Sequence, residues 1–527
     1  MDGHDAVVVG GGPNGLVAAI LLADAGWDVL VLEASDEPGG AVRTAEVTAP
    51  GFRNDLFSAF YPLAAGSSVM GALGLERYGL RWAHAPAVVA HPTLDGPAAV
   101  LHRRPEDTAA ALDLFAPGDG DAWLDLFARW RRLGPHLLAS LLSPFPPVRA
   151  ALRLAAAIGP GRLLETARFA LLPVRRLADE HFRGAGGGLL LAGNALHADV
   201  SPDAAPSGML GWLLASLGQD RGFPVPVGGA GALTGALVAR LRAAGGSLRC
   251  GAAVDRIVTE PAGRRHRAVG VEVEGARFRA GRAVLAAVDA VRLLRDLLPQ
   301  EAVPAAARRR LSGFQRGWAT VKVDWALDRP VPWQDPVVGT AGTVHLGASM
   351  DELSRGTAEV AGGRIPRDPF VVMGQMTLAD PTRSPPGTES AWAYTHVPAR
   401  CRDRGGPERP LSVADVAAVA RGVEARIERY APGFAARVLA RHVMGPADLE
   451  ARDANLVGGD IGGGTYQLHQ QFVFRPWPGW GRPETGVAGL YLASASAHPG
   501  GGVHGACGSN AARAALAHAR MPRRRRG

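Results

Sequence analysis

The N-terminal segment of the chain runs through strand, glycine turn, helix, strand and acid in a fixed order. Residues 6–9 form an apolar strand that leads into Gly10-Gly11-Gly12-Pro13-Asn14-Gly15. Residues 16–25 repeat apolar side chains at helical spacing, and a second strand, residues 28–32, ends on Glu33. A Rossmann βαβ unit that holds an adenine dinucleotide has this order and spacing. The segment therefore predicts an α/β fold built on a Rossmann-like domain.

Each residue type in this unit has a physical reason to be there. Gly10 permits the tight turn, Gly12 lets the backbone approach a pyrophosphate, and Gly15 lets the helix pack closely on the strand. The helix N-terminus then offers unpaired N–H groups to the phosphates. Glu33 is suited to accept hydrogen bonds from a ribose hydroxyl, and its charge would repel a 2′-phosphate.

A second glycine pair, Gly39-Gly40, follows the acid and leads to Arg43-Thr44. NAD-dependent dehydrogenases normally continue into another helix here. The pair and the nearby arginine resemble the extended motif of FAD-binding oxidoreductases, in which guanidinium and glycine backbone reach the pyrophosphate a second time. The alternative is a surface turn. The motif favours FAD over NAD.

Length and composition limit the remaining classes. With 527 residues the chain is too long for one core, so two or three domains are expected. The net charge is +8. Nearly all of the basic residues are arginine, and Lys322 is the only lysine. The only dense basic run is Arg523–Arg526, so nucleic acid is not expected as a partner.

Three scattered cysteines indicate neither a disulfide framework nor a metal site. Without a signal peptide or long apolar stretch, a cytoplasmic protein is expected.

The order of elements predicts a discontinuous domain organisation. Residues 1–75, 224–298 and 451–527 are assigned to the FAD-binding domain, with one strand expected over Ser247 to Ile257. Residues 76–104 and 299–450 mix strands with a helix, expected over Val413 to Tyr430, and are assigned to an α+β substrate-binding domain. Residues 105–223 are assigned to a helical cap, a possible membrane-facing insertion.

A glycine-rich loop near the C-terminus is the second candidate site. Gly500-Gly501-Gly502 stands directly before an apolar helix, so its backbone could lie against a flat ring, and the helix N-terminus could stabilise a reduced flavin. His498 and His504 flank the loop as candidate general bases, the alternative being hydrogen-bonded structural histidines. Cys507 is a candidate for covalent flavin attachment or, more simply, a buried packing residue. A further cluster, residues 458–464, is either a flavin contact or a crossover between domains.

Together these motifs resemble the phytoene desaturase-like FAD oxidoreductases, in a branch found in actinobacteria and related to an animal pyridine nucleotide-disulfide oxidoreductase-domain protein. The resemblance implies that adenine contacts Val254 and that the ribose contacts Glu33. It places the isoalloxazine at Gly501, Gly502 and Val503. The remaining FAD contacts that it implies are Gly10, Gly12, Pro13, Asn14, Gly15, Ala34, Gly40, Arg43 and Thr44.

The resemblance also implies the activity. Family members desaturate carbon–carbon bonds of apolar, often isoprenoid, substrates by hydride transfer to flavin N5, and the electrons pass to oxygen or a quinone. Two alternatives stay open: a flavin amine oxidase, whose usual lysine beside N5 is not obviously matched by Lys322, and a non-catalytic prenyl-binding escort protein of the GDP-dissociation-inhibitor type. Such desaturases often sit on membranes. The arginine-rich residues 149–176 are therefore either a peripheral contact with the inner face of the membrane or the solvated face of a cap helix.

Overall fold

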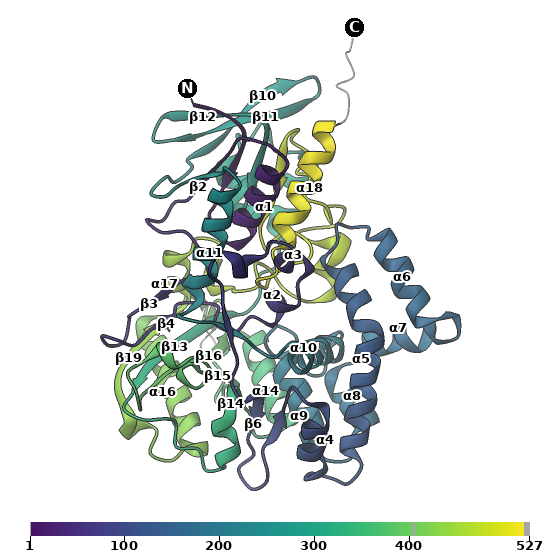
Figure 1. Ribbon diagram of the computed structural model, residues 1–527, viewed down its shortest axis with the longest axis vertical. Helices are drawn as coiled ribbons and strands as arrows, with labels where there is room; N and C mark the ends of the chain where they lie inside the picture. Colours follow the sequence, from purple (N-terminus) through teal and green to yellow (C-terminus); the bar gives the residue numbers. More distant parts are fainter. Residues whose placement is uncertain (1, 403–405, 521–527) are drawn as a thin grey trace.

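The computed structural model describes residues 2–402 and 406–520, and its core is divided between two large sheets and a group of helices (Figure 1). Arg523–Arg526, the basic run noted in the sequence, lie outside the described residues. No helix within the described ranges is long and apolar enough to cross a bilayer. The mixed α/β fold with a Rossmann-like domain is confirmed.

The first sheet carries the dinucleotide motif and draws its strands from distant parts of the chain. Its strand order is β10-β11-β12-β1-β2-β9, and β20 pairs with β12. The pairs β1–β2, β1–β12, β2–β9 and β12–β20 are parallel, whereas β10, β11 and β12 form an antiparallel meander. The strands are β1 (Asp2–Val9), β2 (Val29–Leu32), β9 (Ser247–Arg249), β10 (Arg256–Ala262), β11 (Arg265–Val273), β12 (Ala276–Ala286) and β20 (Leu490–Leu492).

Three helices cover one face of this sheet: α1 (Pro13–Asp24), α11 (Ala230–Ala243) and α18 (Ala506–Arg520). Their alanine and leucine side chains form one core with the strands. In Figure 1, α1 and α18 lie side by side although they come from opposite ends of the chain. Two short helices, α2 (Pro62–Gly66) and α3 (Ser68–Gly71), lead away from this layer.

The second sheet has the order β19-β13-β16-β15-β14-β6-β7, and α16 (Val413–Tyr430) packs on its apolar face. Alternation along the strands gives this sheet two different faces. The strands are β6 (Ala87–His91), β7 (Ala99–Leu101), β13 (Ala319–Leu327), β14 (Ala341–Leu346), β15 (Val371–Gln375), β16 (Glu389–Val397) and β19 (Val438–Met444). The helices α14 (Met350–Ala361), α15 (Met376–Ala379) and α17 (Pro446–Arg452) connect these strands or follow them.

A group of helices fills residues 105–221 and stands beside the second sheet at the lower right of Figure 1. It has its own core of leucine, tryptophan and phenylalanine side chains. Its members are α4 (Pro105–Asp113), α5 (Asp119–Leu142), α6 (Val148–Ile158), α7 (Leu163–Leu171), α8 (Val174–His181), α9 (Ala185–Ala195) and α10 (Ser207–Arg221).

The single strand expected over Ser247 to Ile257 is wrong. The chain forms β9, leaves the sheet, and re-enters at the other end as β10. Gly251 at φ 62° makes the turn that ends β9, and the N–H of Ala252 donates to the carbonyl of Glu33 at 2.8 Å. Gly251 is the local sign of this turn, but the contact that ends the strand is made to Glu33 on a distant segment, which the sequence of residues 247–257 does not show.

The contact between α1 and α18 is close enough to exclude any side chain at Gly508. A Cβ there would lie 1.9 Å from the backbone oxygen of Asn14. We expect Gly508→Ala to lower the free energy of unfolding by about 3 kcal/mol, because neither backbone has room to move, and to reduce flavin retention. Thermal unfolding and flavin content measure both effects.

The matched control for this prediction is Gly235→Ala on α11. A Cβ at Gly235 meets nothing within 4 Å, so the exchange should raise stability by about 0.5–1 kcal/mol through helix propensity alone. Equal effects of the two substitutions would contradict the close contact.

Candidate functional site

A cavity of about 700 Å³ lies between the first sheet, the second sheet and the helical group. This volume is within the range of small-molecule and cofactor sites. Most of the residues that the sequence assigned to FAD line it, from all three separated segments of the chain. These are Gly10, Gly12, Pro13, Asn14, Gly15, Glu33, Ala34, Gly40, Val254, Gly501, Gly502 and Val503.

The glycines at the N-terminal end of the cavity form a cradle that side chains would fill. A Cβ on Gly15 would lie 2.0 Å from the Gly10 oxygen, and one on Gly40 would lie 3.3 Å from the Gly12 Cα. The backbone is therefore bare on the side from which a pyrophosphate would approach the α1 N-terminus. The Asn14 side-chain oxygen is buried there without a hydrogen-bond partner among the described residues. These residues fit a bound dinucleotide.

Glu33 is buried at the end of β2, and its carboxylate organises the loops around it. One oxygen accepts from the N–H of Gly11 at 2.6 Å, and the other accepts from the N–H of Ser35 at 2.9 Å. Each carboxylate oxygen has a second lone pair, so Glu33 is still able to accept from a ribose hydroxyl. The carboxylate thus has a structural role as well as the predicted binding role.

Two of the assigned residues lie outside the cavity lining. The Arg43 guanidinium donates to the carbonyls of Gly40 at 2.9 Å and Arg452 at 2.6 Å. The Thr44 hydroxyl donates to Asp55 at 2.7 Å. Both side chains thus hold the glycine loop against its neighbours. Arg292 and Arg452 line the cavity instead, and neither belongs to a motif that could be recognised in the sequence.

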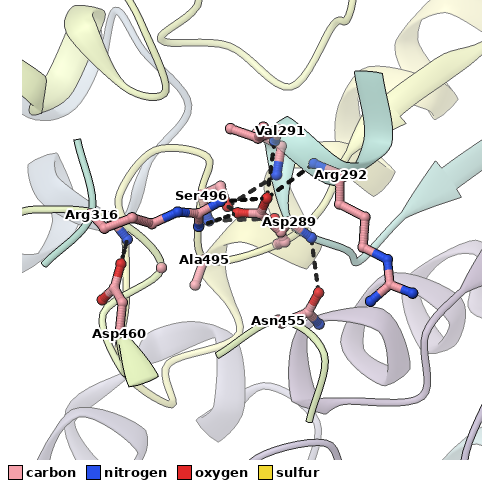
Figure 2. A network of polar contacts seen from close by, with 12 residues as sticks. Asp289, Val291, Arg292, Arg316, Asn455, Asp460, Ala495 and Ser496 are labelled. Atoms are coloured by element: carbon pink, nitrogen blue, oxygen red, sulfur yellow. Dashed lines mark hydrogen bonds and ion pairs between the residues drawn. The ribbon is translucent and has the colours of Figure 1, made fainter. Parts of the chain in front are cut away.

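A buried carboxylate in the cavity wall, Asp289, joins separate segments of the chain (Figure 2). Arg316 donates to both of its oxygens, at 2.6 and 2.8 Å, and the Ser496 hydroxyl donates to one of them at 3.1 Å. Its own N–H donates to the Asn455 side chain at 2.8 Å. Burial alone would raise the pKa of Asp289, but the hydrogen bonds and charge of Arg316 hold it below the ordinary value. Figure 2 shows the Arg292 side chain extending away from this network.

The C-terminal loop brings its glycines to the cavity but not its histidines. His498 and His504 are buried outside the lining, and burial lowers the pKa of each to about 4. His498 Nε2 donates to the carbonyl of Ser143 at 3.1 Å, while His504 Nδ1 accepts from the N–H of Ala506 at 3.0 Å. These contacts are those of structural histidines. Burial also raises the pKa of the Cys507 thiol to about 11, and this side chain lies outside the lining too.

Two acidic side chains that the sequence did not single out as catalytic face the cavity. Asp460 accepts three backbone N–H bonds, from Gly317, Gly462 and Gly464. These N–H groups form a nest that stabilises its carboxylate. Within the described part of the chain, Asp199 accepts from the Thr465 hydroxyl and the N–H of Tyr466 alone. Burial, and then the charge of Asp460, raises the pKa of Asp199 to about 6. Asp199 is therefore a group that exchanges a proton near neutral pH.

The end of the cavity away from the glycine turns lies on the second sheet and has a different character. Its walls are mainly aromatic: Phe60, Phe223, Trp318, Trp392 and Tyr394. Lys322, which the sequence did not place near the cofactor, also lines it, 3% exposed and paired with Asp324. The face of β13 that Lys322 occupies depends on how the two sheets meet, which a local sequence pattern does not show.

Comparison with known proteins agrees with this geometry. Residues 8–68 match the family model described as NAD(P)-binding Rossmann-like domain. Mouse pyridine nucleotide-disulfide oxidoreductase domain-containing protein 2 is 29% identical, over 97% of this chain and 92% of its own. The neurosporene-forming phytoene desaturase of Cereibacter sphaeroides is 25% identical, over 98% and 95%. A putrescine oxidase structure superposes with a TM-score of 0.59 at 17% identity, covering 98% of this chain and 99% of that one, which shows a shared fold.

Fold, cavity and comparisons define an FAD-dependent oxidoreductase on a Rossmann-like domain. Within that class, the relatives that match nearly the whole chain include pyridine nucleotide-disulfide oxidoreductase domain-containing protein 2 and the phytoene desaturases. The resemblance drawn from the motifs is confirmed. These relatives do not indicate a non-catalytic escort protein.

Glu33 provides a direct test of the cofactor site. We expect Glu33→Arg to reduce flavin content at least about tenfold, because it removes the acceptor for Gly11 and places a cation in the turn. Absorbance of the released flavin measures occupancy. Glu37→Arg makes the same charge change on the exposed part of this loop and should keep its flavin. A yellow, fully loaded Glu33→Arg variant would remove Glu33 from the site.

Proposed function

We propose that this protein desaturates a carbon–carbon bond of a largely apolar substrate, with isoprenoids as the leading class. The observation that supports this most directly is the continuity of the cavity. The glycine cradle for FAD leads into a chamber with mainly aromatic walls on the second sheet, and Asp199 faces the same space. A hydrocarbon body is stabilised against such walls by removal from water.

Desaturation removes a hydride from one carbon and a proton from the next. Bound FAD supplies the two-electron acceptor for the hydride. Asp199 is suited to take the proton, because two hydrogen bonds stabilise its ionised form only weakly against burial. Backbone N–H groups stabilise the neighbouring Asp460 carboxylate, and its negative charge makes Asp199 more basic. Oxygen or a quinone then receives the two electrons as the final acceptor.

A flavin amine oxidase is the second candidate, and Lys322 is the observation that favours it. The chain has one lysine, and it is buried in the wall of the cavity. A lysine near the flavin is common among amine oxidases. The ammonium of Lys322 is paired with Asp324, however, so this pair offers a cationic amine no net negative charge.

Anaerobic flavin bleaching separates these two functions. We expect at least one member of a panel of isoprenoids, hydrocarbon and oxygenated, to bleach the flavin, and benzylamine and putrescine to leave it oxidised. The rate of bleaching should rise with pH through about 6, because Asp199 accepts a proton only when ionised. Asp199→Asn should slow bleaching about 100-fold or more and abolish this pH dependence.

The control for Asp199→Asn is Asp203→Asn, four residues away on the surface, which should keep the wild-type rate and pH profile. Bleaching by an amine but by no isoprenoid would assign the protein to the amine oxidases. An unchanged pH profile in Asp199→Asn would show that another group takes the proton.

We also propose that the helical group rests on an anionic membrane surface through α6 and α7, which lie at its outer edge in Figure 1. None of the residues of α6 is buried. Leu152 and Leu164 are 66% and 85% exposed. Arg168 is paired with Glu180, whereas Arg149 and Arg153 form none of the ion pairs found among the described residues. Apolar side chains between unpaired arginines match the chemistry of a lipid headgroup layer.

Vesicle co-sedimentation tests this surface. The protein should sediment with phosphatidylglycerol-containing vesicles more than with neutral phosphatidylcholine vesicles, and Leu152→Glu with Leu164→Glu should abolish the difference. Val413→Glu alters an equally exposed side chain on α16 and should not. Equal sedimentation of all variants would leave α6 and α7 as an ordinary solvated face.

A further inference from the structure

One face of the second sheet is polar where it meets the cavity, although it is buried. In the register of β13 and β16, Thr320 stands opposite His396 and Lys322 stands opposite Tyr394. All four line the cavity. The alternate residues of β13, such as Val321 and Val323, point to the other face and belong to the apolar core under α16. The polar face is thus a distinct surface set into an otherwise hydrophobic layer.

Thr320 has a hydroxyl that the protein leaves unsatisfied. Its side chain is 3% exposed, and within residues 2–402 and 406–520 its Oγ1 has no hydrogen-bond partner. Burying a hydroxyl without a partner destabilises a fold, and valine has the same shape without this cost. A threonine in this position therefore indicates a polar ligand atom that the hydroxyl meets.

Lys322 brings a second donor to the same place. The two residues are separated by one position on β13, so their Cα atoms are about 7 Å apart on one face. An ammonium has three donors, and the hydrogen bond to Asp324 uses one of them. No other hydrogen-bond partner of this ammonium occurs in the described part of the chain. Thr320 and Lys322 together offer donors to a single acceptor atom.

The charge balance selects the kind of acceptor. Lys322 and Asp324 neutralise each other, and Arg383 nearby is paired with two buried carboxylates, Asp55 and Asp380. His396 is neutral, because burial lowers its pKa to about 4, and its Nε2 donates to the carbonyl of Leu196 at 3.0 Å. The surface thus presents donors without net positive charge. A neutral oxygen matches it better than a carboxylate, which would bring an unbalanced charge into a buried site.

We propose that Thr320 and Lys322 form a subsite for one neutral carbonyl or hydroxyl oxygen of the substrate, so that the substrate is an oxygenated molecule and not a pure hydrocarbon. This inference rests on the proposed function and narrows it. The aromatic walls hold the hydrocarbon body, and the subsite fixes its orientation in the chamber. A single well-placed polar contact in an apolar cavity has this effect on specificity.

Matched probes test the subsite in the flavin-loaded protein. Acetophenone and α-methylstyrene have the same shape and differ by a carbonyl oxygen in place of a methylene group. We expect acetophenone to bind about tenfold more tightly or better, measured by perturbation of the flavin spectrum. Thr320→Val should abolish this preference, and Thr320→Ser, which keeps the hydroxyl, should retain it. Flavin content should not change in either variant.

Thr395→Val is the matched control. Thr395 neighbours His396 on β16 but points to the other face, where its hydroxyl donates to the carbonyl of Phe370 at 2.6 Å, so the preference for acetophenone should persist. Equal binding of the two probes to the wild type, or tighter binding of benzoate than of acetophenone, would overturn the proposal. Loss of flavin from Thr320→Val would assign the hydroxyl to the cofactor instead. A colourless wild-type protein would defeat the proposed function itself, which is a different outcome.

Discussion

The packing of α1 against α18 at Gly508 and Asn14 is the contact on which the rest of the site depends. The turn before α1 carries the glycine cradle, and the loop before α18 carries Gly501 and Gly502. Because no side chain fits between the two backbones, the two helices have a fixed separation. Both ends of the cofactor cavity are therefore positioned by one backbone contact between segments that are almost 500 residues apart.

A buried charge network holds the third side of the cavity. Asp289, at the end of β12, binds Arg316 on the approach to β13 as well as Ser496 and Asn455 in the later loops. The Asp289 carboxylate thus connects the first sheet to the second. Without these partners, its burial as a charged group would destabilise the fold. Replacing one partner would leave the other charge without compensation, which typically costs about 3–5 kcal/mol. The network is therefore a structural condition for the cavity, and Asp289, Asn455 and Ser496 also form part of its wall.

The sequence predicted most reliably what depends on local pattern. The strand, turn, helix and acid from residue 6 to Glu33 form a local unit, and α16 was expected over the residues that it occupies, Val413–Tyr430. The sequence did not show which side chains of distant strands share one face of a cavity. Lys322 and Thr320 alternate like any strand residues until β13 meets β16, and Asp199 lies in a loop without a recognised motif. The motif after Glu33 assigns Arg43 to the pyrophosphate. Its guanidinium also binds carbonyls of its own loop and of Arg452, and the position of Arg452 depends on the tertiary fold.

The parallel pairing of β20 with β12 has a consequence for biosynthesis. Val284, Leu285 and Ala286 meet Leu490, Tyr491 and Leu492, so the first sheet stays incomplete until the ribosome has passed residue 492. The cofactor cavity closes later still, with Val503. Helices and strands made earlier are able to collapse, but they have no complete flavin site to stabilise them by ligand binding. Flavin uptake thus waits until the residues up to Val503 have been made, and the shorter nascent chain must survive without its cofactor.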